Sequence, residues 1–239
     1  MAKILHIETS GKNCSVAISE NSQLIAHLRI EEERSHAAHL SQMIINALAK
    51  AEIAANDLDA VAVSEGPGSY TGLRIGVSIA KGICYAANIP LIAIPTLEIM
   101  LAHLKTEAEQ KQMIPQDADL FIPMIDARRM EVYNCIFSTQ KRLVRKVQAE
   151  IIDQNSFKSY LKTNTLVFFG DGSNKCQNII SHKNTIFING ILPDAQYMLE
   201  IAEQKFAESQ FVNLAYYEPF YLKAFQATVP KNSVLKNLQ

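Results

Sequence analysis

The sequence predicts an α/β protein built of two lobes, each with the element order βββαβα. The length of 239 residues and the hydrophobic content of 48% are enough for two cores, each formed by roughly 100 to 120 residues. A meander of three strands followed by alternating helices and strands occurs twice along the chain. Residues 105–119 separate the two occurrences, and they carry charge without apolar periodicity. We therefore expect a first lobe at residues 1–105 and a second at residues 118–239.

The first lobe is expected to open with antiparallel strands and to continue with parallel ones. Polar turns separate the first three apolar runs, and from Ser35 onward apolar residues recur at the three- and four-residue spacing of a helix with one buried face. Strict alternation of strands and helices then favours parallel pairing. The predicted strands span residues 4–10, 14–18, 23–28, 59–64 and 91–94, and the predicted helices span residues 36–51, residues 71–86 and a stretch after Thr96.

The second lobe is expected to repeat this arrangement. Its first two strands are joined by a polar turn at residues 126–129, and a Gly-Asp-Gly-Ser turn follows the fourth strand. The predicted strands span residues 120–125, 131–137, 143–152, 166–169 and 185–188. The predicted helices span residues 153–161, a short stretch after Ser173, and residues 194–207.

A glycine-rich segment at residues 65–76 joins a predicted strand to a predicted helix. Such a loop directs the free N–H groups of the helix outward, where anions usually bind. Its glycine spacing fits neither a P-loop nor a dinucleotide fingerprint, and no Gly-x-Ser-x-Gly elbow of a hydrolase occurs. The cofactor-binding candidates in the segment are Gly66, Gly68, Ser69, Thr71 and Gly72. A tight turn into a packed helix is the alternative interpretation, and spacing alone leaves both open.

Charge and cysteine usage exclude several classes of protein. With 23 basic and 24 acidic residues, the chain has no global field to attract nucleic acid or an anionic membrane. The four cysteines have no paired spacing, as expected of reduced thiols in a cytosolic protein. No signal peptide and no run of 18 apolar residues occur. We expect a cytoplasmic protein that does not bind membranes.

Two histidines at the start of the first predicted helix are the nearest approach to a metal site. His36 and His39 lie on one helical face, but a zinc site needs a third or fourth ligand, and no other histidine is near in sequence. We expect no metal site, and a solvated or interfacial role for this pair.

The helix after the glycine segment points to a partner. Gly72, Gly76 and Ala80 form a stripe of small residues that continues, one turn later, to residues 81–83 with Gly82, and further apolar residues occupy the other faces of the helix. One sheet cannot cover all of these faces, so a surplus apolar face requires another surface. Packing against its own lobe accounts for part of the stripe.

Several runs of residues, in order along nearly the whole chain, resemble the TsaB family. The matching runs are Ile7–Ser10, Ser15–Ala17, Gly66–Gly76, Ala80–Gly82, Asp126–Arg128, Glu131–Tyr133, Gly170–Gly172 and Tyr221–Leu222. The glycine segment is highly specific, whereas the shorter matches mean little alone. The resemblance implies the two-lobe actin/Hsp70-like, or ribonuclease H-like, fold.

The resemblance also implies a function without catalysis by this chain. TsaB proteins are inactive relatives of TsaD that bind and activate it in the N6-threonylcarbamoyladenosine modification of tRNA. The implied partners are TsaD, the ATPase TsaE, a second copy of the chain when TsaD is absent, and tRNA through the complex alone. No cofactor of this chain is expected, apart from ATP or ADP at the interface of the complex.

The resemblance extends to individual residues. Thr9 and Ser10, in the first hairpin, join the cofactor-binding candidates. The helices at residues 36–51 and 71–86 are expected to pack against TsaD, and the interface candidates are His36, Leu40, Ile44, Arg74, Gly76, Ala80 and Ile83.

The first strand departs from the family pattern. TsaB relatives usually end this strand in Asp-Thr-Ser, whereas Glu8 stands here in place of the aspartate. Phosphotransfer needs carboxylates that hold Mg²⁺, and we expect no ATP hydrolysis by this chain alone. The alternative is a stand-alone nucleotide-dependent kinase or ATPase of the same superfold.

Overall fold

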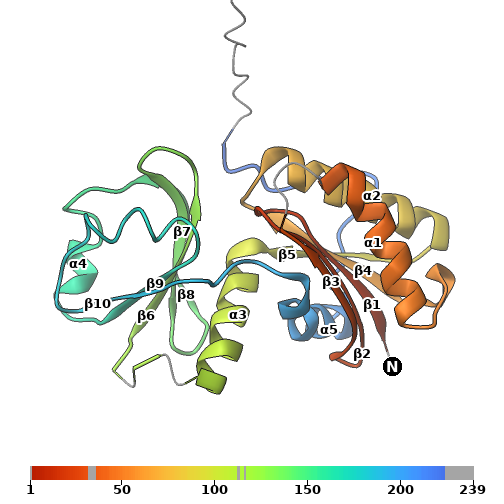
Figure 1. The fold of residues 1–239 in the computed structure, drawn as a ribbon, viewed down its shortest axis with the longest axis horizontal. Helices are drawn as coiled ribbons and strands as arrows, with labels where there is room; N and C mark the ends of the chain where they lie inside the picture. The colour runs from red at the N-terminus through yellow and green to blue at the C-terminus, as the bar shows by residue number, and fades with distance from the viewer. Residues whose placement is uncertain (1, 32–35, 112–113, 116, 224–239) are drawn as a thin grey trace, which may run out of the picture.

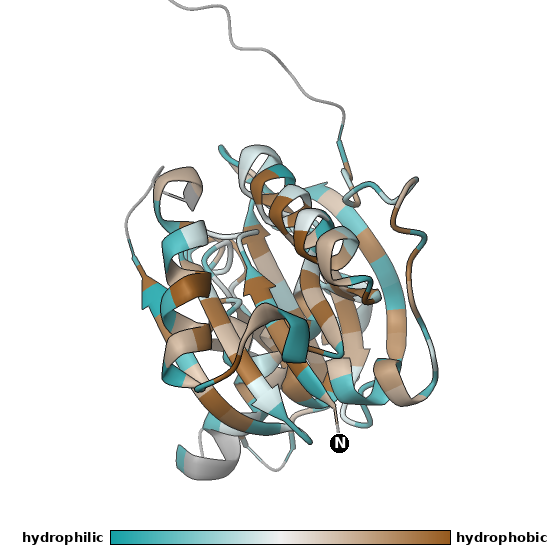
Figure 2. Ribbon diagram, turned by 90° about the vertical axis from the view of Figure 1, so that its right-hand side faces the viewer, coloured by the Kyte–Doolittle hydropathy of each residue, from teal (hydrophilic) through white to brown (hydrophobic). Residues whose placement is uncertain are grey.

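The structure is a computed structural model, and it describes residues 2–31, 36–111, 114–115 and 117–223, without the side chains of residue 36 and residues 108–110. In this part of the chain, two five-stranded mixed sheets form two lobes that lie next to each other (Figure 1). Hydrophobic residues gather on the strands and on the inward sides of the helices (Figure 2).

The first sheet has the strand order β3-β2-β1-β4-β5. The first three strands pair antiparallel, and β4 and β5 continue the sheet parallel to β1. The strands are β1 (Lys3–Glu8), β2 (Cys14–Glu20), β3 (Gln23–Ile30), β4 (Ala60–Gly66) and β5 (Leu91–Pro95). This is the predicted meander followed by parallel strands.

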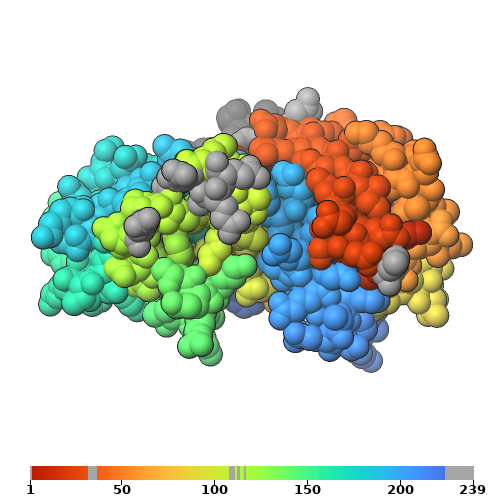
Figure 3. Space-filling model, turned by 90° about the horizontal axis from the view of Figure 1, so that it is seen from below, coloured from red at the N-terminus to blue at the C-terminus, as the bar shows by residue number. Residues whose placement is uncertain are grey.

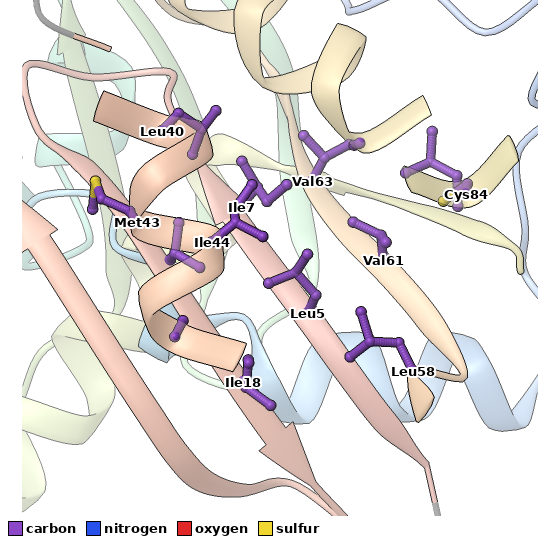
Figure 4. Packing of buried hydrophobic residues seen from close by; sticks show 14 of the residues in the cluster. Leu5, Ile7, Ile18, Leu40, Met43, Ile44, Leu58, Val61, Val63 and Cys84 are labelled. Carbon is purple, nitrogen blue, oxygen red and sulfur yellow. The ribbon is translucent and has the colours of Figure 1, made fainter. Parts of the chain in front are cut away.

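Helices cover both faces of this sheet, so its central strands are buried on both sides. α1 (His36–Lys50) and α2 (Tyr70–Ala87) lie on one face (Figure 1). Leu5 and Ile7 of β1 point toward this layer, while Ile4 belongs to the cluster on the opposite face. The alternation follows from the two-residue period of a strand. Figure 4 shows Leu5 and Ile7 facing the side chains of α1.

The second sheet repeats the arrangement with the order β10-β9-β6-β7-β8. Its first three strands in the sequence pair antiparallel, and β9 and β10 extend it in parallel. The strands are β6 (Leu120–Asp126), β7 (Glu131–Ser138), β8 (Leu143–Ile151), β9 (Leu166–Phe169) and β10 (Thr185–Ile188). The single-turn helix α4 (Lys158–Leu161) lies beside them.

The two lobes exchange a helix. α3 (Thr96–Lys111) follows the first sheet in sequence, yet Met100 and Leu104 pack with Phe121 and Phe169 of the second. The short helix η2 (Ala195–Tyr197) and α5 (Leu199–Ala207) follow the second sheet, yet they cover the free face of the first. Figure 3 shows the part of the chain that contains η2 and α5, in blue, against the N-terminal residues in red. The strands of each sheet lie on one side of residues 105–118 in the sequence, whereas α3 and α5 pack across this boundary.

Polar contacts hold the returning segment to the first lobe. The Ala195 N–H donates to the Ser15 hydroxyl over 2.9 Å, and a ring nitrogen of His27 lies 2.8 Å from Asp194 Oδ1. Asp194 is fully buried, and it also accepts from the Gln196 N–H at the start of η2. The exchange is therefore fixed by hydrogen bonds as well as by apolar packing.

Three predicted helices of the second lobe differ from the structure. The helix expected at 153–161 is reduced to α4, because Asp153 accepts from the N–H groups of Asn155 and Ser156 and holds a turn there. The prediction of a short helix after Ser173 is wrong, since residues 171–179 form turns. The helix expected at 194–207 is divided into η2 and α5.

Candidate functional site

The turn that follows β1 contains a buried carboxylate. Both the N–H and the hydroxyl of Ser10 donate to Glu8 Oε1 over 2.5 Å, and Glu8 is fully buried. Burial raises the pKa of Glu8 to about 7, against the opposing effect of the Ser10 hydrogen bonds. Its second oxygen, Oε2, has no hydrogen-bond partner among the described residues. The carboxylate is thus enclosed by the protein and is not presented to a phosphate or a metal ion.

The glycine loop packs directly on this turn. A Cβ on Gly68 would collide with the carbonyl oxygen of Ser10, and a Cβ on Gly72 would collide with that of Thr9. The Ser69 N–H donates to the Ser10 carbonyl over 2.7 Å, and the Ser69 hydroxyl accepts from the Gly72 N–H over 3.2 Å to cap α2. The chain's own backbone therefore lies where a phosphate would approach, which favours the tight-turn interpretation over an anion site.

The remaining candidates lie around the same junction. Gly66 has a φ of +113°, and a Cβ there would collide with the carbonyl oxygen of Phe220. Gly76, in the second turn of α2, lies against the Thr9 hydroxyl. Thr71 is exposed on the first turn of α2. The structure thus brings the seven predicted residues together, with the first hairpin seated on the loop.

A small cleft opens between the lobes beside this turn. It is lined by Ser10, Gly11, Lys12, Asn13, Ile125, Asp171, Leu192 and Pro193. The enclosed free space is about 20 Å³, which has room for about one water molecule. A nucleotide does not fit there without separation of the lobes. We predicted only a turn at residues 11–13, and the polar side chains of that turn were the available signal for this cleft.

The two acidic residues of the second lobe near the cleft are already bound by protein groups. Asp171 Oδ1 accepts from the Asp126 N–H over 3.0 Å, and Asp126 Oδ1 lies 2.5 Å from Lys175 Nζ. Burial raises the pKa of Asp171, while the hydrogen bond from Asp126 and the charge of Lys12 oppose that shift. These carboxylates therefore stabilise the ends of their own strands.

The histidines are placed separately. Among the described residues, no group of three or more His, Cys, Asp or Glu side chains could hold a metal ion. His39 is half-buried on α1, and the side chain of His36 lies outside the described part of the chain. His6 is fully buried with a ring nitrogen 2.8 Å from the Ser19 hydroxyl, and burial lowers its pKa to about 3.

Four of the predicted interface residues belong to the core of the first lobe. Leu40 and Ile44, which we predicted at a partner interface, are buried in the cluster that includes Leu5 (Figure 4). Ala80 is buried in the same cluster, and Gly76 is buried against Thr9. The apolar stripe of each amphipathic helix faces its own sheet.

Arg74 and Ile83 remain accessible on α2. Arg74 is exposed and Ile83 is half-buried. Among the predicted interface candidates whose side chains the structure describes, a partner could reach these two without opening the core of the first lobe.

The outer side of the α1/α2 layer combines small residues with two large apolar ones. Ile45 of α1 is 58% exposed and Tyr85 of α2 is 84% exposed. Ala49 and Ser78 are also exposed, and a Cβ on Gly82 would meet no atom within 4 Å. Gly82 belongs to the small-residue stripe that we predicted. Ile45, Ala49, Ser78 and Tyr85 were missed because they lie on the helix faces opposite the apolar stripe. We call Ile45, Ala49, Ser78, Gly82 and Tyr85 the outer helical face.

Comparisons with known proteins decide the family. A family model described as "TsaD: tRNA N6-adenosine threonylcarbamoyltransferase" matches residues 24–231. A curated "tRNA threonylcarbamoyladenosine biosynthesis protein TsaB" of Haemophilus influenzae is 28% identical over 231 residues, which cover 92% of this chain and 93% of that protein. The chain belongs to the TsaB family. The Escherichia coli K12 protein of the same name is 29% identical over 92% of this chain and 94% of its own length.

A solved structure shares the fold of this TsaB-family chain. It is described as an uncharacterized protein from Pseudomonas aeruginosa with similarity to peptidase YeaZ. The two chains are 25% identical with a TM-score of 0.79, and the match covers 93% of this chain and all of the other. The predicted two-lobe actin/Hsp70-like fold is confirmed. No helix in the described ranges is long and apolar enough to cross a membrane.

Proposed function

We propose that this chain is a non-catalytic subunit that binds and activates a TsaD-type threonylcarbamoyltransferase in the N6-threonylcarbamoyladenosine modification of tRNA. The observation that carries the proposal is the outer helical face, where Ile45 and Tyr85 are 58% and 84% exposed beside small residues. Small side chains allow a second pair of helices to approach closely, and a large exposed aromatic residue is typical of an interface anchor.

The residues in and around the cleft between the lobes support a non-catalytic role for this chain. Phosphoryl transfer requires carboxylates that hold Mg²⁺ near the phosphates. Here the Glu8 carboxylate is buried against Ser10, and Asp126 and Asp171 are held by protein groups. The glycine loop is occupied by the backbone of the first hairpin. We therefore assign the transfer chemistry to the TsaD-type subunit.

Other members of the assembly follow from the same proposal. A TsaE-type ATPase joins the pair, and tRNA is bound through the complex, since a chain with net charge −1 has no global positive field to attract a phosphate backbone. ATP or ADP binds at the interface of the complex. In the absence of the TsaD-type subunit, a second copy of this chain covers the outer helical face.

A reconstitution experiment tests the activity. The full chain is assayed alone and with the TsaD-type and TsaE-type proteins of the same organism, tRNA, ATP and threonylcarbamoyl adenylate. We expect modified tRNA only in the complete mixture. Modified tRNA formed without the TsaD-type protein, or phosphorylation of a sugar or acetate by the isolated chain, would overturn the proposal.

A substitution on the outer helical face tests the docking surface. Gly82→Arg places a long side chain where open space surrounds the Cβ position, so the fold is preserved and a partner helix is blocked. Ala207→Arg, on the exposed end of α5, is the matched control. We expect Gly82→Arg alone to abolish binding of the TsaD-type protein, measured by calorimetry. Unchanged binding by Gly82→Arg excludes this face.

A further inference from the structure

A groove lies between α2 and the segment that follows α5. We call residues 212–223 the strap. The strap begins at the edge of the first sheet, where the Val212 N–H donates to the Leu91 carbonyl over 3.0 Å. It continues to the glycine loop, where the Phe220 N–H donates to the Glu65 carbonyl over 2.8 Å. Both ends of the strap are therefore held by backbone hydrogen bonds.

The walls of the groove are formed before any partner binds. The groove has a volume of about 340 Å³ and is lined by Tyr70, Arg74, Val77, Ser78, Lys81, Tyr217, Glu218, Pro219 and Tyr221. Lys81 Nζ donates to the carbonyl oxygens of Ala215 and Tyr217, each over 3.2 Å, and so ties the strap to α2. The rings of Tyr70 and Tyr221 lie 4.5 Å apart between their centroids. A ligand therefore meets a preorganised site, which lowers the entropic cost of binding.

Arg74 is the polar group of this groove with the most unused capacity. Its guanidinium has five N–H donors, and among the described residues it donates one hydrogen bond, to the Tyr70 hydroxyl over 3.4 Å. Its Cζ also lies 5.5 Å from the centroid of the Tyr70 ring. The ion pairs of the described residues do not include Arg74. Lys81 differs, since its ammonium is occupied by the strap.

We propose that the groove binds a carboxylate side chain of a protein partner, with Arg74 as the residue that receives it. A planar guanidinium binds a carboxylate through two parallel hydrogen bonds. The tyrosine side chains that line the groove shield this ion pair from water. The groove borders Ser78 on the outer helical face, so one partner covers both surfaces. The identity of this partner as the TsaD-type subunit rests on the proposed function.

The groove does not suit RNA. Single-stranded nucleic acid is bound by a row of cations and by aromatic faces on which bases stack. Here Glu218 adds a negative charge to the groove, and the rings of Tyr70 and Tyr221 are packed against each other. The Arg74 guanidinium is one positive group that can pair with one carboxylate, whereas a phosphate backbone needs several cations along its length.

Two substitutions of Arg74 test the proposal with the full chain and the TsaD-type protein of the same organism as probe. Arg74→Gln removes the charge, and Arg74→Lys keeps the charge without the planar pair of donors. Arg142→Gln, at an exposed arginine of the second lobe, is the matched control. We expect binding by Arg74→Gln to be weaker by about tenfold or more, Arg74→Lys to be intermediate, and the control to be unchanged. The dependence of affinity on salt should be flatter for Arg74→Gln.

A charge-reversal scan identifies the carboxylate residue of the partner that pairs with Arg74. Arg74→Glu is combined with single Asp or Glu to Lys changes on the surface of the TsaD-type protein. We expect one such change to restore binding, because it re-creates the ion pair in the opposite direction.

The outcomes separate the two proposals. If Arg74→Gln binds like the unaltered chain at low and high salt while Gly82→Arg does not bind, the groove proposal is overturned and the proposed function stands. If neither substitution affects binding, the groove and the outer helical face are both excluded as docking surfaces. The proposed function fails if the complete reconstitution mixture yields no more modified tRNA than the mixture without this chain. A loss confined to tRNA binding, or to self-association of this chain, also overturns the assignment to a protein partner's carboxylate.

Discussion

The hydroxyl and the N–H of Ser10 both donate to one carboxylate oxygen of Glu8, each over 2.5 Å. This pair closes the first hairpin from inside, and the glycine loop then packs on the closed turn. A longer acid at this position reaches back to its own turn. The element that would open toward a phosphate in an active enzyme instead stabilises the junction between a hairpin and a helix.

The pH dependence of stability should report on Glu8. Burial raises its pKa from 4.5 to about 7, so the folded state binds more protons than the unfolded state between these values. The contribution to stability is therefore complete below pH 4.5 and is lost as the pH rises through about 7. The shift corresponds to about 3 kcal/mol as an order of magnitude.

Urea unfolding of the full chain on both sides of this window measures the effect, with Glu8→Gln as the comparison. The amide stays neutral, so the fall in stability of the unaltered chain should be absent from the variant. Equal pH profiles for the two proteins would contradict the burial of an ionisable carboxyl group.

Two glycines of α2 should respond oppositely to the same change. Gly72→Ala places a Cβ against the Thr9 carbonyl oxygen, and the backbone must shift, which costs about 1–3 kcal/mol. Gly82→Ala enters open space and gains about 0.5–1 kcal/mol from helix propensity. Thermal unfolding of both variants checks the pair, and a neutral Gly72→Ala would show that the hairpin is not seated on the loop.

The exchanged helix should stabilise the lobe that precedes it in the sequence. Met198 is fully buried with Ile4 and Ile92 of the first sheet, so Met198→Ala should cost about 2–5 kcal/mol. Hydrogen exchange should then accelerate in β1 and β5. Ile180→Ala, in a cluster of the second lobe, is the control and should instead affect β6 and β9. If Met198→Ala instead accelerated hydrogen exchange in β6 and β9, the packing of the η2 and α5 segment on the first sheet would be contradicted.

Tyr85 should matter for binding and not for folding. Because it is 84% exposed, Tyr85→Ala should leave the melting temperature unchanged and weaken binding of the TsaD-type protein by about tenfold or more. Ile151→Ala, which removes another exposed apolar side chain from the second lobe, is the matched control. If the two variants bound the TsaD-type protein with equal affinity, Tyr85 would not be part of the interface.

The strands and the first three helices were predictable because their patterns are local. The two-residue period of β1 and the capped helix that follows Ser69 depend on neighbours within a few residues. Which sheet α3 and α5 would cover was not predictable, since that depends on contacts between segments far apart in the sequence.

The candidate site divides in the same way. The spacing of the glycine segment left an anion site and a tight turn both open, and the structure shows that the backbone of Thr9 and Ser10 packs against Gly72 and Gly68. Periodicity located the apolar faces of α1 and α2 but not the surfaces that these faces contact. Leu40 and Ile44, which we predicted at the partner interface, face Leu5 and Ile7. The strap could not be foreseen, because its side chains follow no regular period.

The exchange of helices also constrains the order in which the chain can mature during translation. The first sheet leaves the ribosome long before Met198 and Ala202, which cover one of its faces. Until those residues emerge, the cluster around Ile4 and Ile92 lacks part of its cover. The core of the first lobe is therefore completed only after the second sheet has been synthesised.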